Sequence, residues 1–170
     1  MKKNILLIFT LLFSALLFNA CTQNAPVASS VTDSTKNISQ VFDTYWEENA
    51  KLFPLDATSQ GDNRYNNILN NDATQSFRDS LKNFYQKYLN EITAFDREKL
   101  DENDKISYDI FKYEMESKLK GLTLNTWMIP TQQFWGLPIT MGQLGSGEGN
   151  QPFKTIEDYE NWLGRVKSYS

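Results

Sequence analysis

From residue 38 onward, apolar residues recur mostly at spacings of three and four, which is the spacing of one face of an α-helix. Four segments carry such a stripe, and the pattern therefore predicts an all-α fold of about four helices. The stripes are Ile38, Val41, Phe42, Tyr45, Trp46, Leu52 and Phe53; then Phe77, Leu81, Phe84, Tyr85, Tyr88, Ile92 and Phe95; then Tyr108, Phe111, Met115, Leu119 and Leu122, widened by Ile106, Ile110 and Tyr113; and finally Ile156, Tyr159, Leu163 and Val166.

Polar residues and glycine mark the ends of several of these helices. Asp72 or Thr74 is expected to cap the second helix, because an oxygen there can accept from free N–H groups of the first turn. Gly121 is expected to end the third helix in the left-handed conformation. The spacing of Thr155 and Asp158 resembles a capping box, which predicts the start of the fourth helix.

Residues 124–153 show no sustained period and are rich in Trp, Pro, Gln and Gly. Long irregular segments are uncommon in compact domains and are often functional or partner-bound. The aromatic side chains of Trp127, Phe134 and Trp135 either stack on a ring ligand such as a sugar or serve as packing anchors. Residues 145–149 lack the Gly-Lys-Ser/Thr of a phosphate-binding loop, so a mobile loop is expected there.

The N-terminus is typical of a bacterial secretion signal. Two lysines precede an apolar run over residues 5–18, and Ala20 is followed by Cys21. This arrangement defines a secretory signal, and the run is shorter than the roughly 20 residues that cross a bilayer. Ala20-Cys21 resembles a lipobox, so we expect cleavage before Cys21 and acylation of its thiol. The acyl chains would make the membrane a partner of the mature protein.

The remaining residues divide into a tether and a folded part. Residues 22–37 contain no aromatic residue and are dominated by small and polar side chains, which is typical of a flexible linker. The predicted organisation is therefore a signal peptide at 1–20, a lipidated cysteine and tether at 21–37, and a helical domain at 38–170. We expect an exported protein of the cell envelope that is anchored in the outer membrane. Because no acidic run of the kind that resembles a surface-export tag follows Cys21, we expect the protein to face the periplasm.

The amino-acid composition limits the kinds of catalytic and binding sites that the chain can form. The chain contains no histidine and one cysteine, so the commonest zinc ligand and general base are absent. Its net charge is −4, which disfavours nucleic acid as a partner. The paired carboxylates are interpreted as solvated, since Lys112 with Glu116 and Glu114 with Lys118 have the i,i+4 spacing of surface ion pairs. We therefore predict no catalytic residue, metal ligand or cofactor for this chain.

One turn motif, residues 61–65, combines an acid, a guanidinium and a phenol. In Gly61-Asp62-Asn63-Arg64-Tyr65, the Arg64 side chain can form a bidentate pair with a carboxylate, and Asp62 is the nearby candidate. Two interpretations are open. Gly61, Asp62, Arg64 and Tyr65 either clamp the junction between two helices or contact a ligand.

Four short motifs, taken together, resemble a known family. Tyr45-Trp46, residues 61–65, Ser107-Tyr108-Asp109 and residues 158–163 occur in an order and spacing similar to the start of the bacterial domain of unknown function 885 family. The resemblance covers most of residues 38–170.

The resemblance implies a long, mostly helical and often lipid-anchored protein similar to gluzincin metallopeptidases. Their zinc site is a His-Glu-x-x-His helix plus a downstream glutamate, and no position here matches it. This chain is thus expected to be the N-terminal part of a larger helical domain, with zinc and the missing C-terminal segment belonging to the longer parent. The alternative is a non-catalytic lipoprotein that binds a peptide, glycan or protein.

Overall fold

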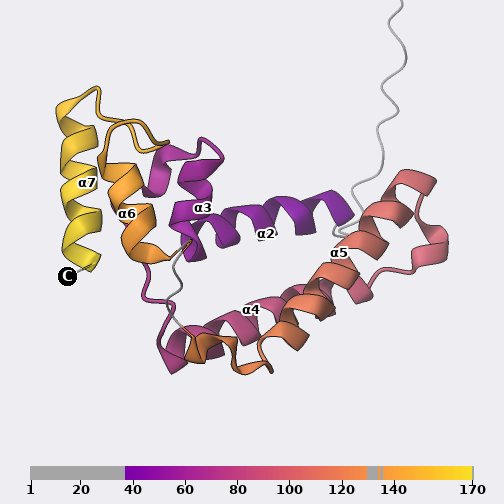
Figure 1. Cartoon of the computed structure of the whole chain (residues 1–170). Helices are drawn as coiled ribbons and strands as arrows, with labels where there is room; N and C mark the ends of the chain where they lie inside the picture. The colour runs from indigo at the N-terminus through magenta and orange to yellow at the C-terminus, as the bar shows by residue number, and fades with distance from the viewer. Residues whose placement is uncertain (1–36, 130–133, 135, 170) are drawn as a thin grey trace, which may run out of the picture. The chain divides into compact units, whose positions relative to one another are not determined.

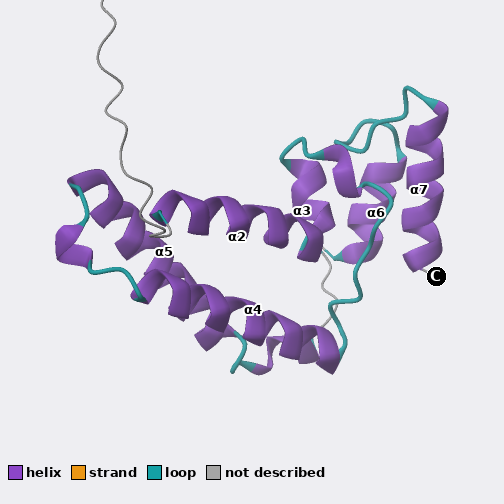
Figure 2. Cartoon of the chain, turned by 180° about the vertical axis from the view of Figure 1, so that it is seen from behind, coloured by secondary structure: helices purple, strands orange, loops and turns teal. Residues whose placement is uncertain are grey.

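A computed structural model describes residues 37–129, 134 and 136–169, and in these ranges it contains helices and turns without a strand (Figures 1 and 2). The prediction of an all-α fold is confirmed. The predicted signal peptide, Cys21 and nearly all of the predicted tether lie outside the described residues. Lys36–Ser170 forms one compact unit. None of the described helices is both long and apolar enough to cross a bilayer.

Three long helices build the main core. They are α2 (Ile38–Leu52), α4 (Gln75–Thr93) and α5 (Glu102–Gly121), with the short helix η2 (Arg97–Lys99) between α4 and α5. Helix α4 packs against both α5 and α2. The buried residues come from the three predicted stripes: Ile38, Val41, Leu81, Phe84, Tyr85, Tyr88, Ile92, Tyr108, Phe111 and Met115.

Aromatic rings join the three helices at the centre of this core. The Tyr45 ring lies 5.3 Å from that of Phe84, 5.1 Å from Tyr88 and 5.0 Å from Phe111, measured between centroids. Two of these contacts are edge-to-face, an arrangement worth about 0.5–1.5 kcal/mol beyond the area buried. Because these partners come from α4 and α5, Tyr45 of α2 fixes all three helices together.

Two of the helix-end predictions are confirmed and one is wrong. Thr74, rather than Asp72, caps α4 by accepting from the Phe77 N–H at 3.2 Å. Asp158 accepts from the Thr155 N–H at 2.8 Å, while the Asp158 N–H donates to the Thr155 hydroxyl at 3.2 Å. Gly121 does not have a positive φ. Helix α5 ends instead with the Leu122 N–H donating to the Lys118 carbonyl at 3.1 Å.

A second group of helices follows α2. It comprises α3 (Pro54–Ser59), η1 (Asn63–Tyr65), α6 (Leu137–Gly145) and α7 (Ile156–Tyr169). Helices α6 and α7 lie side by side in both views (Figures 1 and 2). Their approach depends on Gly145, where an added Cβ would lie 2.7 Å from the Trp162 ring.

The prediction that residues 124–153 lack regular structure is wrong in part. This segment contains η3 (Asn125–Met128) and α6. The period of α6 is hidden because the helix is short and contains Pro138 and Gly142. Proline in the first turn costs no hydrogen bond that the helix would otherwise make. The turn at Ser146–Gly149 follows α6, and Gly147 there has a φ of +80°.

Two apolar faces remain exposed in the described structure. On α5, the residues expected to widen the stripe are exposed, with Ile106 at 59%, Ile110 at 62% and Tyr113 at 72%. On α7, Ile156 is 80% exposed, Tyr159 56% and Leu163 65%. The apolar stripe of α7 is real, but the described part of the chain does not cover it.

Candidate functional site

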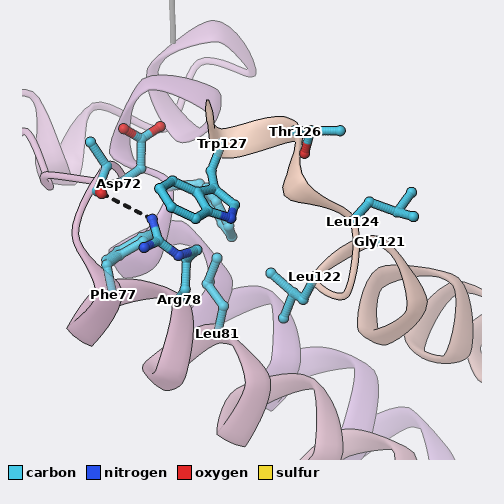
Figure 3. Close-up of a pocket in the computed structure, with 11 residues that line it drawn as sticks. Asp72, Phe77, Arg78, Leu81, Gly121, Leu122, Leu124, Thr126 and Trp127 are labelled. Carbon is cyan, nitrogen blue, oxygen red and sulfur yellow. Dashed lines mark hydrogen bonds between the residues drawn. The ribbon is translucent and has the colours of Figure 1, made fainter. Parts of the chain in front are cut away.

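An apolar cavity of about 330 Å³ lies between the start of α4 and the turn after α5 (Figure 3). Most of its lining side chains are apolar, and the polar ones come from the loop before α4, from α4 itself and from η3. The lining residues are Phe53, Asp72, Ala73, Phe77, Arg78, Leu81, Gly121, Leu122, Leu124, Thr126 and Trp127. It is a small pocket with few polar groups, as ligand sites in proteins usually are.

Among the described residues, Arg78 is the one cation in the lining of this cavity. Its guanidinium lies 4.2 Å from the centroid of the Trp127 ring, a cation–π contact. Nη1 donates to the Ala73 carbonyl at 2.9 Å, and Nη2 donates to the Gln75 Oε1 at 2.9 Å. Figure 3 shows Arg78 and Asp72 on either side of the indole of Trp127. Within the described residues, no carboxylate forms an ion pair with Arg78.

The described structure does not bring all three aromatic residues of the predicted ring-stacking cluster to the cavity. Trp127 lines the cavity, and one of its faces is already in contact with Arg78. Phe134 is 72% exposed, and Trp135 lies outside the described residues. The described structure therefore brings only Trp127 of this cluster to the cavity.

The predicted motif at residues 61–65 lies elsewhere, at the turn that contains η1. Arg64 donates from Nη1 and Nη2 to the two carboxylate oxygens of Glu47, at 2.7 and 3.1 Å. It also donates from Nε to the Asp62 Oδ1 at 2.9 Å and from Nη2 to Oδ2 at 2.7 Å. Glu47 belongs to α2, so this ion-pair cluster joins the turn to the first helix.

The same contacts explain the electrostatics of the motif. Hydrogen bonds from Arg64 hold the pKa of Glu47 and of Asp62 below their ordinary values. The Arg64 side chain is half exposed, at 52%. Gly61 has a φ of +88°, which favours glycine there, and the Tyr65 ring lies 5.4 Å from the Arg64 guanidinium. This geometry is that of a surface clamp, and contact with a ligand stays a hypothesis.

A second arginine, Arg165, is fully buried on α7 and was missed in the sequence. It was missed because Arg is almost never fully buried, and because the apolar stripe of α7 predicts a different buried face. The pattern of α7 offers no signal for this burial. Its guanidinium is surrounded by Gln151 Oε1 at 2.6 Å, Tyr65 O at 2.8 Å, Thr58 Oγ1 at 2.9 Å, Ile68 O at 3.0 Å and Pro54 O at 3.4 Å.

All five acceptors of Arg165 are neutral, and in the described residues no carboxylate pairs with it. Burial lowers the pKa of Arg165 to about 10, which still leaves the guanidinium charged at neutral pH. Because these acceptors belong to α3, to the η1 turn and to the loop before α7, Arg165 ties three segments to one helix. This is a structural role, since the side chain is 0% exposed and no ligand in solution reaches it.

Several of the described acidic side chains lie in pairs with lysine or arginine. Lys118 lies 3.4 Å from Glu114, and Lys112 lies 4.0 Å from Glu116, as the i,i+4 spacing predicts. Among the described residues there is no group of three or more His, Cys, Asp or Glu placed to hold a metal ion.

A family described as bacterial protein of unknown function (DUF885) matches residues 54–170. No curated protein and no solved structure matches the chain. The resemblance to this family is thereby confirmed, and three of the four sequence motifs lie within the matched residues, whereas Tyr45-Trp46 lies outside them.

Proposed function

The chain belongs to the DUF885 family of bacterial proteins, and from this membership we propose that it is the non-catalytic helical part of an exported, lipid-anchored zinc-metallopeptidase-like protein. Its residues include no histidine, so the His-Glu-x-x-His helix of such a protein is supplied by another segment. In this proposal, residues 38–170 support the wall of the substrate cleft. Cys21 anchors the protein in the outer membrane.

The observation that carries this proposal is the exposed apolar face of α7. Ile156, Tyr159 and Leu163 are exposed, at 80%, 56% and 65%. Burying one large apolar side chain is worth about 1.5–3 kcal/mol, so a helix that leaves three of them in water forgoes much of its available stability. Meanwhile the opposite side of α7 is fixed by buried Arg165. A rigidly held helix that presents an apolar stripe is suited to pack against further helices of the same protein.

Photocrosslinking in cells tests this packing. A photoreactive phenylalanine derivative is placed at Leu163, and the matched control is placed at Glu98, whose side chain is 77% exposed in η2. We expect the probe at position 163 to crosslink to a polypeptide segment containing His-Glu-x-x-His, identified by mass spectrometry, and the probe at 98 not to. If position 163 gives no more product than position 98, or its product lacks the zinc motif, the proposal is wrong.

A second candidate function is supported by a different observation. The cavity beside Arg78 and Trp127 has the composition of a small ligand site, which favours a lipoprotein that binds a peptide, glycan or protein without chemistry. The crosslinking experiment separates the two functions, because a binding lipoprotein does not require a zinc-site segment against α7.

A further inference from the structure

We propose that the cavity between α4 and η3 binds a small monocarboxylate with an apolar body, in which Arg78 receives the carboxylate. This site is independent of the proposed packing of α7, because none of its lining residues lies on α7 (Figure 3). The class of ligand follows from three features: the volume and lining of the cavity, the free donors of Arg78, and the charge at Asp72.

The lining of the cavity favours a ligand whose body is apolar. Phe53, Phe77, Leu81, Leu122 and Trp127 are among the residues that line the cavity, and its volume is about 330 Å³. Ligand sites commonly begin at about 300 Å³, so this one accepts a small molecule or one side chain rather than a long chain. A phenyl or branched aliphatic group is the natural occupant.

The guanidinium of Arg78 selects the polar end of the ligand. A guanidinium has five N–H donors, and two hydrogen bonds, to the Ala73 carbonyl and to Gln75 Oε1, are accounted for here. The remaining donors are left for a ligand. Stacking on Trp127 holds the plane of the guanidinium, which lowers the entropy lost when an anion binds. A carboxylate is the anion whose geometry matches this fork best.

Asp72 limits the charge that the site accepts. Its side chain lines the same cavity, and no hydrogen bond or ion pair of the described residues involves it (Figure 3). The residue is exposed, so water and salt screen its repulsion of a single carboxylate. A ligand with a second negative charge would place that charge close to Asp72, where no further cation among the described lining residues compensates the repulsion. The site therefore favours a monoanion over a dianion.

Isothermal titration calorimetry tests the site on the full chain, purified as produced in its host. The probe is N-acetyl-L-phenylalanine, and its uncharged counterpart is N-acetyl-L-phenylalaninamide. We expect the acid to bind at least about tenfold more tightly than the amide, since a hydrogen bond to a charged group is typically worth such a factor.

Four variants locate the binding. Arg78→Gln should weaken the acid about tenfold and remove its preference over the amide. Lys82→Gln removes a cation on an exposed part of the same helix and should change nothing. Gly121→Leu places a large side chain at a lining residue where a Cβ meets no atom within 4 Å, and it should abolish binding of both probes. Asp72→Asn should strengthen binding of the acid.

The result that supports the proposal is weaker acid binding in Arg78→Gln and no binding in Gly121→Leu, with acid binding by Lys82→Gln unchanged and every variant still folded at the assay temperature. Absence of binding in the unmodified chain overturns it. Equal affinity for acid and amide, or acid binding that survives Arg78→Gln in a folded protein, also overturns it, because the cavity would then not select a carboxylate.

Discussion

Two arginines hold helices together by different physical means. Arg64 lies at the surface and is paired with two carboxylates, so its charge is balanced and partly screened by water. Arg165 is buried among neutral oxygens, so its hydrogen bonds must offset the cost of removing a charge from water. The contribution of each residue to stability therefore depends on burial rather than on the number of its contacts.

Replacing these two arginines should have very different effects. Arg165→Ala leaves the Gln151 side chain and several backbone carbonyls without their donor in a buried space, and should cost about 2–4 kcal/mol of unfolding free energy. Arg64→Ala, the matched surface change, should lower the melting temperature only slightly, because the freed Glu47 and Asp62 remain accessible to water. Thermal and urea unfolding of both variants give the comparison.

A large loss for Arg64→Ala together with a small loss for Arg165→Ala would contradict the arrangement described. Circular dichroism at low temperature serves as the control that each variant still folds into helices.

At the scale of elements, the ends of the helices decide how the chain turns. Helix α4 begins at a threonine cap, and α7 begins at a capping box in which backbone N–H groups hold the pKa of Asp158 below its ordinary value. Helix α5 ends without the left-handed glycine that the sequence suggests. The reason is that the chain continues in right-handed geometry through Leu122, whose N–H still finds the Lys118 carbonyl.

Gly121 and Gly61 differ in backbone conformation, so replacing them with alanine should have opposite effects on stability. Gly121 ends α5 without a positive φ and has open space at its Cβ, so Gly121→Ala should stabilise the protein by about 0.5–1 kcal/mol through the unfolded state. Gly61 has a φ of +88°, so Gly61→Ala should destabilise it by about 1 kcal/mol. Urea denaturation of the pair provides the test. Destabilisation by Gly121→Ala would indicate the left-handed stop after all.

At the scale of the whole molecule, the described helices form a unit with a dense aromatic core and exposed apolar stripes on α5 and α7. The buried residues of this core come from α2, α4 and α5, and Phe53, Phe95, Leu100 and Leu122 from adjoining segments pack against them. The apolar stripes on α5 and α7 are not covered by the described residues. Exposed apolar surface of this kind commonly marks an interaction site. In the proposed function, α7 packs against further helices while Cys21 fixes the N-terminus to the membrane.

The proposed anchor gives a prediction of its own. Cells grown with a labelled fatty acid should label the wild-type protein and not the Cys21→Ser variant, because acylation requires the thiol that follows Ala20. The wild type should also fractionate with membranes after a salt wash that removes peripheral proteins. Equal labelling of both forms would show that Cys21 is not the acylated residue.

The sequence by itself determined the positions of α2, α4 and α5, and the capping box of α7. These features are local. A stripe such as Leu81, Tyr85 and Tyr88 encodes its helix in its own spacing, and Thr155 with Asp158 encodes a helix start within four residues. Family membership was accessible for the same reason, since the motifs are short and ordered along the chain.

Only the tertiary structure decided which side chains meet across long separations. The pairing of Arg64 with Glu47, the burial of Arg165 and the cavity beside Arg78 each depend on helices that are distant in sequence. The orientation of α7 is the clearest case. Periodicity reveals that a helix has an apolar face, but the free energy of the surrounding contacts decides which face is covered. Here the hydrogen bonds of Arg165 hold α7 so that Ile156 and Leu163 remain in water.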